Sequence, residues 1–450
     1  MPAHRSTAPE TTQSAIAPTP ERVASVVTLR VVATPDVERR GTVVRLAEGR
    51  RLVLGRDPED GLRLADPRLS RAHLALDVVR GKVTVTDLGS KNGTFVSGRP
   101  APSTGSVEIP DGGVIRAGES VFVVRHGDAV DNHERLGLLG NAPAVVALRH
   151  QIRTVAKSRL SVLVLGPTGV GKEVVARAVH QASGRRGAFV AVNCAALPET
   201  LVESTLFGHR RGAFTHAVQD EPGAFARADG GTLLLDEVGD LALIAQPKLL
   251  RAVETGEVVP VGGTAGRKVD VRIVAATNRD LANDVAAGRF REDLYARLAG
   301  VIASPPPLAA RREDVLELFS AFLPESLRSR PMSPDAAEAL VLWSWPRNVR
   351  ELEKVAQRLA VVEGEAARWE LGHLDPTMQR AVLVRSAQPV TEADPEDAPD
   401  TARPESADAL IALLAECDGN VSALAERVGR TRRQVYRWMD RLGVPRGAGR

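Results

Sequence analysis

The 450-residue sequence has only two cysteines, Cys194 and Cys417, only seven lysines, and no long apolar run. Two cysteines can form neither a disulfide framework nor a four-cysteine zinc site, and they fit a reducing compartment. No apolar stretch approaches the roughly 18 residues that a membrane-spanning helix needs. The N-terminal residues contain no apolar core of the signal-peptide type. These absences argue against secreted and membrane proteins, so we expect a cytoplasmic protein with no membrane partner.

The sequence otherwise has an ordinary soluble composition, with 43% hydrophobic and 26% charged residues and a formal net charge of +3. A chain of this length exceeds what one hydrophobic core supports, so two to four domains are expected. The small net charge conceals an uneven distribution. Between Arg427 and Arg450 there are eight arginines and one acidic residue, Asp440. This local excess predicts contact with a polyanion.

Changes in residue pattern along the chain predict its domain boundaries. Short β-rich runs broken by Gly, Asp and Pro predict an all-β sandwich, and alternating apolar strands and helices predict an α/β subdomain with a mostly parallel sheet. Stretches rich in Pro and polar residues predict disorder or a linker. The predicted parts are a disordered arm (1–26), the sandwich (27–126), the α/β subdomain (137–305), a helical subdomain (306–378), a flexible linker (379–405) and a small all-α unit (406–446).

A glycine-rich loop, GPTGVGKE, follows the apolar strand SVLVL and opens a helix. Glycine lets the backbone curl so that several N–H groups face a phosphate, and the helix N-terminus adds a favourable dipole. Lys172 can reach the outer phosphates, whereas Glu173 stands where Ser or Thr would ligate Mg²⁺. The predicted ATP-binding residues of this loop are Gly166, Pro167, Thr168, Gly169, Val170, Gly171, Lys172 and Glu173.

A second predicted strand, GGTLLLDE, ends in two carboxylates. Asp236 can hold Mg²⁺, and Glu237 can polarise an attacking water as a general base. Two acidic residues at a strand end are weak evidence alone. Together with the glycine-rich loop they predict an ATPase that uses ATP and Mg²⁺.

Residues 137 to about 375 resemble the AAA+ module of sigma-54-dependent bacterial transcription activators. The motifs VNCAALPETLVES, LFGHRRGAFTHA, GGTLLLDEVGDL, VRIVAATN, FREDLYARL and WPRNVREL occur in family order. The resemblance implies a ring assembly, usually of six subunits. It implies that Asn193 restrains the catalytic glutamate, that Thr277 and Asn278 form a sensor, that Arg291 and Arg297 are arginine fingers for a neighbouring subunit, and that Arg350 is a sensor in the helical lid.

The loop that grips sigma-54 in this family reads GAFTGA, and here it departs from that pattern. Its residues are Gly212, Ala213, Phe214, Thr215, His216 and Ala217. His216 replaces a glycine, and glycine permits backbone angles that a Cβ forbids. Thr205 also stands where the family usually has Glu before LFGH. Two interpretations therefore stay open: unchanged engagement of sigma-54, or an altered partner.

Three loops of the predicted sandwich, LGRDPEDGLRLAD, RLSRAHLAL and DLGSKNGTFVSG, resemble those of a forkhead-associated (FHA) domain, a reader of phosphothreonine peptides. A dianionic phosphate favours charge-assisted donors from Arg and a hydroxyl, held on loops above a rigid sheet. Lys91 stands where Thr is common. The resemblance implies phosphopeptide contacts from Arg56, Ser70, Arg71, Ser90, Lys91 and Asn92, with Gly55 and His73 in the framework.

The C-terminal unit resembles the Fis-type helix-turn-helix domain that ends this activator family. In its last predicted helix Val435, Trp438, Met439 and Leu442 are spaced i, i+3, i+4, i+7, which predicts a buried stripe. The outward residues are basic, so we expect binding to enhancer-like double-stranded DNA as a dimer. The predicted DNA contacts are Arg432, Arg433, Gln434, Tyr436 and Arg437.

The sequence therefore predicts an ATP-dependent activator of sigma-54 RNA polymerase that binds DNA, is regulated by a phosphothreonine protein or peptide, and acts as a hexameric ring. Two alternatives remain. The protein is an AAA+ regulator that acts on a partner other than sigma-54, or it is a non-hydrolysing, DNA-bound phosphopeptide adaptor.

Overall fold

The computed structural model describes residues 26–127, 134–214, 217–387, 407–417, 421–427 and, near the C-terminus, Val435, Trp438, Met439, Leu442 and Val444. The chain divides into two compact units, residues 1–389 and 390–450. Within the described ranges, no helix combines the length and the apolarity that crossing a bilayer requires. The predicted N-terminal arm lies outside the described residues.

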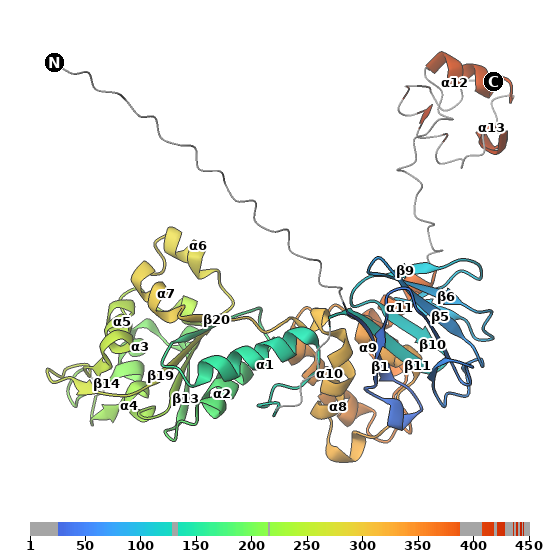
Figure 1. Cartoon of the computed structure of the whole chain (residues 1–450). Helices are drawn as coiled ribbons and strands as arrows, with labels where there is room; N and C mark the ends of the chain where they lie inside the picture. The colour runs from blue at the N-terminus through green and yellow to red at the C-terminus, as the bar shows by residue number, and fades with distance from the viewer. Residues whose placement is uncertain are drawn as a thin grey trace, which may run out of the picture. The chain divides into compact units, whose positions relative to one another are not determined.

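The N-terminal part of the first unit is a sandwich of two β-sheets, drawn in blue in Figure 1. One sheet has the strand order β2-β1-β11-β10-β7-β8 and the other β4-β3-β5-β6-β9. Alternate side chains point inward along a strand, and Leu29, Leu54, Leu76 and Phe122 are fully buried between the sheets. The predicted all-β sandwich is confirmed. Its elements are β1 Val27–Ala33, η1 Val37–Arg39, β2 Val43–Leu46, β3 Arg51–Gly55, β4 Gly61–Arg63, β5 Leu74–Val79, β6 Lys82–Asp87, β7 Thr94–Val96, β8 Arg99–Pro100, β9 Val107–Ile109, β10 Val114–Ala117 and β11 Ser120–His126.

The α/β subdomain contains a parallel five-stranded sheet in the order β13-β16-β19-β12-β20. Its strands read as continuous apolar runs because helices cover both faces, and two separate apolar clusters lie on the two sides. The sheet strands are β12 Val162–Leu165, β13 Phe189–Asn193, β16 Thr232–Asp236, β19 Arg272–Thr277 and β20 Val301–Ala303. The helices are α1 Pro143–Ala156, α2 Lys172–Ser183, α3 Glu199–Phe207, α4 Ala224–Arg227, α5 Gln246–Thr255, α6 Leu281–Ala286 and α7 Glu292–Leu298.

The helical lid packs around the buried indoles of Trp345 and Trp369. Its helices are α8 Val315–Phe322, α9 Pro334–Leu342, α10 Asn348–Val362 and α11 Pro376–Ala387. Helix α11 continues to Ala387, so it extends into the 379–405 stretch that was predicted to be linker. The physical reason is that Met378 and Val382 are both buried in the lid core, which stabilises the helix beyond the predicted boundary.

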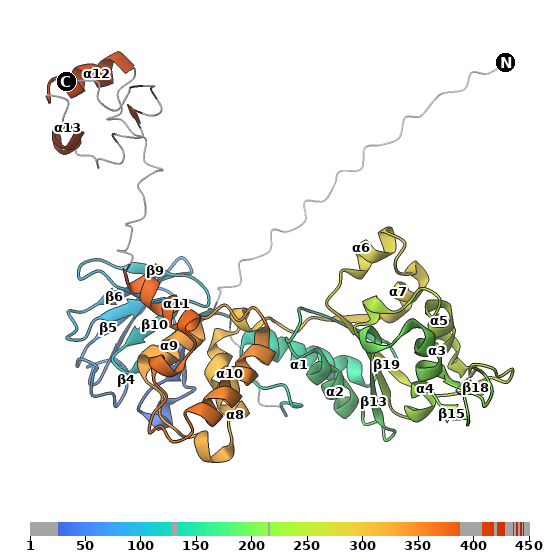
Figure 2. The same ribbon diagram turned by 180° about the vertical axis from the view of Figure 1, so that it is seen from behind.

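The sandwich packs directly against the lid, as Figure 2 shows for β10 and α9. Valines of β10 and β11 form a shared apolar cluster with residues of α9: Val114, Val121 and Val123 on one side, and Ala337, Val341 and Leu342 on the other. Two ion pairs with fully buried carboxylates flank this cluster, Arg116–Glu338 and Arg125–Glu313. The sandwich and the lid are therefore docked through both apolar and charged contacts.

The second unit contains α12 Ala407–Ala415 and α13 Val421–Arg427. Leu410, Leu414 and Leu424 of these helices share a buried apolar cluster with Val435, Trp438, Met439 and Val444, against which Leu442 also packs. The predicted apolar stripe thus lies in the core of this unit. The predicted DNA-contacting residues Arg432, Arg433, Gln434, Tyr436 and Arg437 lie outside the described residues.

Candidate functional site

Two glycines shape the phosphate loop between β12 and α2. Gly169 and Gly171 have φ angles of +76° and +105°, in the left-handed region that a Cβ disfavours. They turn the chain so that Lys172 is the first residue of α2. The Glu173 side chain lies on the exposed side of the helix, where its Oε1 accepts a hydrogen bond from Arg177 Nη2 at 2.7 Å. The predicted ATP-binding residues 166–173 therefore form one strand–loop–helix turn.

Glu237 lies beside this loop and is held by two donors. It follows β16 with a φ of +49°, a strained conformation for a residue with a Cβ. Its Oε1 accepts a hydrogen bond from Lys172 Nζ at 3.0 Å, and its Oε2 accepts one from the Asn278 backbone N–H at 3.0 Å. The Asn278 amide in turn donates to Thr168 Oγ1 at 3.1 Å. The structure thus brings together the lysine, the carboxylate and the sensor position that the motifs single out.

Asp236 and Asn193 occupy the ends of neighbouring strands and are paired in the sheet register. Burial raises the pKa of Asp236, the Glu237 carboxylate raises it further, and Lys172 opposes both. The side-chain oxygen of Asn193 accepts a hydrogen bond from the Ala195 N–H at 3.0 Å. In this structure Asn193 therefore caps the turn that follows its strand, while Lys172 and Asn278 hold Glu237.

The lid also contacts the phosphate loop through three hydrogen bonds. The Arg350 backbone N–H donates to Gly169 O at 3.3 Å. The Asn348 amide donates to Thr168 O at 3.2 Å, and Arg311 Nη2 donates to Val170 O at 3.4 Å. Asn348 and Arg311 are additional site residues that the motifs alone did not indicate. The position of Asn348 inside WPRNVREL was the available signal, whereas no local pattern marks Arg311.

Arg291 and Arg297 lie at the two ends of α7 and are both exposed. Arg291 forms an ion pair with Asp293 at 2.7 Å. Within the described ranges, Arg297 has no ion pair and neither arginine donates to the phosphate loop of its own subunit. Thr277, one of the two predicted sensor residues, is fully buried at the end of β19.

The predicted sigma-54 contact loop projects from a hydrogen-bonded base. The Gly212 N–H donates to Ala217 O at 2.8 Å, and the Ala217 N–H donates to Phe214 O at 2.9 Å. The Phe214 side chain is exposed, and its ring lies 4.8 Å from that of His209. Ala213 completes the described part of the loop, whereas Thr215 and His216 lie outside the described residues.

The three predicted phosphopeptide loops converge at one end of the sandwich. The Arg56 N–H donates to Ser70 O at 2.9 Å, and the Lys91 N–H donates to Ser70 Oγ at 3.1 Å. The Asn92 amide donates to Arg68 O at 2.6 Å. A Cβ at Gly55 would lie 2.0 Å from Arg71 O, so only glycine allows the first two loops to approach this closely.

Buried His73 ties the second of these loops to the third. Its Nε2 donates to Gly93 O at 3.1 Å, and its Nδ1 accepts from the Ser70 N–H at 3.1 Å. Burial lowers the pKa of His73, which favours the neutral ring. Ser90 is held separately by Asp87, which accepts from both its N–H and its hydroxyl at 2.7 Å.

The fold and the site define a P-loop protein of the AAA+ class that carries an FHA-type sandwich. Three family profiles match the chain: Sigma-54 interaction domain over residues 138–303, FHA domain over 52–118, and AAA+ ATPase lid domain over 309–390.

The chain is also similar to individual proteins of this class. It is 42% identical over 317 residues to the transcriptional regulatory protein ZraR of Klebsiella oxytoca, covering 68% of this chain and 69% of that protein. It is 40% identical over 319 residues to the regulatory protein LuxO of Vibrio cholerae, covering 70% of this chain and 54% of that protein. The crystal structure of NtrX from Brucella abortus with ADP is 35% identical, with a TM-score of 0.50 and coverage of 69% and 70%. The chain therefore belongs to the family of sigma-54-dependent transcription regulators, and it spans 54–70% of the length of these relatives.

Proposed function

We propose that the protein is an ATP-hydrolysing activator of sigma-54 RNA polymerase, controlled by phosphothreonine binding to its FHA domain. The observation that best supports ATP hydrolysis is the contact between Lys172 and Glu237 at the phosphate loop. A triphosphate draws Lys172 toward its outer oxygens, which releases Glu237 to polarise a water molecule. The ion pair therefore places both groups at the loop where the outer phosphates of ATP would bind.

Mg²⁺ fits this site through Asp236. The carboxylate ends β16 next to the phosphate loop, and its raised pKa reflects burial and the neighbouring Glu237, an environment in which a cation stabilises the ionised form. In the part of the chain that the structure describes, no cluster of three or more His, Cys, Asp or Glu could hold a metal by itself. This agrees with Mg²⁺ sites that rely on one or two carboxylates plus phosphate oxygens and water. Bound Mg²⁺ would neutralise charge on the phosphates.

Arg291 and Arg297 support a site completed by a second subunit. Both are exposed on α7 and neither is used by the phosphate loop of its own chain. An arginine supplied by a neighbour stabilises negative charge that develops on the transferred phosphoryl group. Hydrolysis would then depend on assembly, which is consistent with the proposed hexameric ring.

ATP turnover by the full chain at increasing protein concentration tests this proposal. Glu237→Gln is expected to bind ATP but to lose about 100-fold or more of its turnover, because the general base is removed. Arg297→Ala is expected to lose turnover without losing ATP binding. Arg251→Ala is a matched control, since Arg251 is also exposed and forms an ion pair with Glu257. A wild-type chain that binds ATP without turnover would support the non-hydrolysing adaptor instead.

For the FHA domain we propose a phosphothreonine ligand held by Arg56, Ser70, Arg71, Ser90, Lys91 and Asn92. Their loops lie together, and the exposed guanidinium and ammonium groups offer charge-assisted donors to a dianion. Replacing Arg56 with Ala should abolish binding of phosphothreonine peptides. Replacing Lys82 with Ala on the same sandwich should leave binding unchanged, because Lys82 pairs with Glu108 at 3.0 Å.

We further propose that the C-terminal unit binds enhancer-like DNA as a dimer and so concentrates the ATPase near its promoter. Its packed core of α12, α13 and Trp438 supports a folded domain. The second candidate function keeps the ATPase but changes its partner. The observation that favours it is His216, which replaces a family glycine in the contact loop.

A further inference from the structure

We propose that the phosphopeptide loops and the phosphate loop are energetically coupled through the lid. Glu338 of α9 makes hydrogen bonds that link the sandwich to the lid. This inference rests on the phosphopeptide and nucleotide functions proposed above. It adds the route by which occupancy of one site changes affinity at the other.

Glu338 is a lid residue whose hydrogen-bond donors both come from the sandwich. Its side chain is 0% exposed. Its Oε2 accepts from Arg116 Nε at 2.6 Å, and its Oε1 accepts from the Gly98 backbone N–H at 3.0 Å. A buried carboxylate is strongly destabilised if its partners are lost. The orientation of α9 is therefore tied to the positions of these two donors.

Both donors are fixed by β7, the strand that continues directly from the third phosphopeptide loop. Gly98 lies six positions after Asn92, in the turn that ends β7. Arg116 lies opposite Phe95 of β7 in the sheet register, and its guanidinium carbon is 3.8 Å from the centre of the Phe95 ring. A shift of the loop at Asn92 is thus transmitted through one short strand to both partners of Glu338.

Asn92 reaches the lid by a second route. Its amide donates to Arg68 O at 2.6 Å. Arg68 Nε is 3.3 Å from one oxygen of Glu119, and the other oxygen of Glu119 is 3.2 Å from Arg368 Nη2 in the lid. A bound peptide that accepts a hydrogen bond from the Asn92 amide would compete with Arg68 O. It would thereby change a series of contacts that ends at Arg368 in the lid.

The lid carries the effect from Glu338 to the phosphate loop. Trp345 follows α9, is buried, and donates from Nε1 to Leu340 O at 3.0 Å, which fixes the chain as it leaves the helix. Three positions later the Asn348 amide donates to Thr168 O of the phosphate loop at 3.2 Å. Trp345 thus anchors the segment that joins Glu338 to the contact between Asn348 and Thr168.

The second docking contact leads to the same loop. Arg125 of the sandwich donates to Ala310 O at 2.7 Å and forms an ion pair with Glu313. Between these two lid residues, Arg311 donates to Val170 O at 3.4 Å. One short lid segment thus contacts the sandwich and the phosphate loop together.

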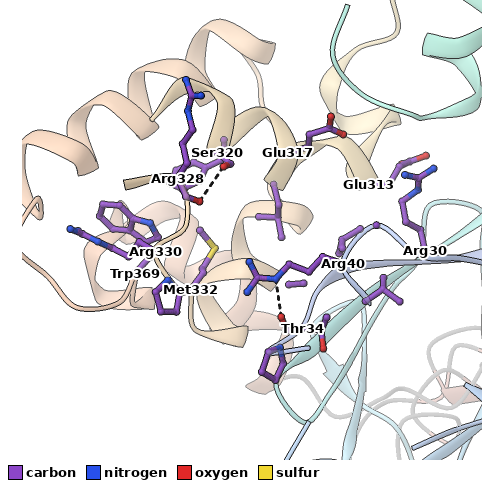
Figure 3. A pocket seen from close by; sticks show the side chains of 18 of the residues that line it. Arg30, Thr34, Arg40, Glu313, Glu317, Ser320, Arg328, Arg330, Met332 and Trp369 are labelled. Atoms are coloured by element: carbon purple, nitrogen blue, oxygen red, sulfur yellow. Dashed lines mark hydrogen bonds between the residues drawn. The ribbon is translucent and has the colours of Figure 1, made fainter. Parts of the chain in front are cut away.

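The docking leaves room for movement. A cavity of about 590 Å³ separates the first strand of the sandwich from α8 and the Trp369 region. Figure 3 shows Arg30, Thr34 and Arg40 on the sandwich side and Met332 and Trp369 on the lid side. The shared apolar cluster and the two ion pairs therefore hold the domains together beside this pocket, which leaves space between them on one side.

Hydrogen exchange of the full chain with and without Mg·ADP tests the coupling, because it needs no peptide. We expect ADP to change exchange of residues 92–98 by about fivefold or more. Glu338→Gln should remove most of this response. Glu108→Gln, an exposed glutamate of the same sandwich, should keep it. If Glu338→Gln does not fold, Glu119→Gln tests the outer route, since its side chain is 19% exposed.

The reverse measurement uses a mixture of phosphothreonine peptides with randomised flanks. Its binding should change the ADP dissociation constant by a similar factor in wild type and not in Glu338→Gln, because coupling is reciprocal. ADP binding with no change in residues 92–98, or an unchanged response in Glu338→Gln, would overturn the coupling. Failure of the peptides to bind would contradict the proposed phosphothreonine function, while the ADP response of residues 92–98 would still test the contacts through the lid. Failure of ADP to bind would contradict both the ATPase function and the coupling.

Discussion

The Arg125–Glu313 pair allows the docking of the sandwich on the lid to be tested by stability. The Glu313 side chain is 0% exposed and accepts three hydrogen bonds from Arg125 at 2.5–2.8 Å. Replacing Arg125 with Met leaves this carboxylate buried without a donor. Breaking one side of a buried pair typically destabilises a protein by about 3–5 kcal/mol. We therefore expect a loss of this size in the free energy of unfolding.

The tryptophans provide the assay. Trp343, Trp345 and Trp369 lie in the lid, and Trp438 is the fourth. In a Trp438→Phe background, urea unfolding followed by fluorescence reports on the lid. With a slope of about 3 kcal/mol per molar urea, the expected loss of about 3–5 kcal/mol lowers the midpoint by about 1–1.7 M.

A double variant separates loss of the pair from loss of packing. Arg125→Met with Glu313→Leu should recover most of the stability, because an apolar pair avoids the desolvation of two charges. The exposed pair Lys82–Glu108 is the matched control, and breaking it should change stability by about 0–1 kcal/mol. A midpoint shift below about 0.3 M for Arg125→Met would refute the docking. So would a double variant as unstable as the sum of the single ones.

Three further predictions concern the lid and the ATPase core. Burial raises the pKa of Asp314 to about 7, so the folded state favours its protonated form, and the stability of the protein falls as pH rises from about 4 to about 7. At pH 8, Asp314→Asn should therefore be more stable than wild type by on the order of 1–4 kcal/mol, and near pH 4 this gain should be absent. Urea titrations at both pH values measure the difference. Gly169→Ala should abolish nucleotide binding measured by calorimetry, because its φ is +76° and its Cβ would lie 2.3 Å from Arg347 O; retained affinity would contradict the packing of the lid on this loop. Burial also raises the pKa of Cys194 to about 12, so at pH 8 a thiol reagent should modify Cys417 and spare Cys194, as mass spectrometry of the native chain would show.

The elements that could be predicted from the sequence are those with a local signature. The strand SVLVL, the glycine-rich loop and the helix after it appear as predicted, since glycine conformation and apolar periodicity act over a few residues. The convergence of the three sandwich loops also followed from their motifs. The end of α11 did not, because its length depends on burial of Val382 by the lid.

The docking of the two domains could not be predicted, because it depends on contacts between distant residues. In SPDAAEAL, Glu338 resembles an exposed residue of a polar helix face. Its burial depends on Arg116, which is 222 positions away in the chain. Similarly, Asn193 is placed next to Asp236 by the sheet register, and the direction of its side chain is set by the Ala195 N–H. Arg116 and Asp236 are both distant in the chain from their partners, so neither appears in a local pattern.

The most direct test of the central claim is remodelling of sigma-54 RNA polymerase on a pre-melted promoter by the full-length protein. We predict that wild-type protein with ATP produces competitor-resistant open complexes. Glu237→Gln, or wild-type protein with a non-hydrolysable analogue, should produce none. ATP turnover without any ATP-dependent change in the sigma-54 complex would contradict the account, and would assign the His216 loop to a different partner.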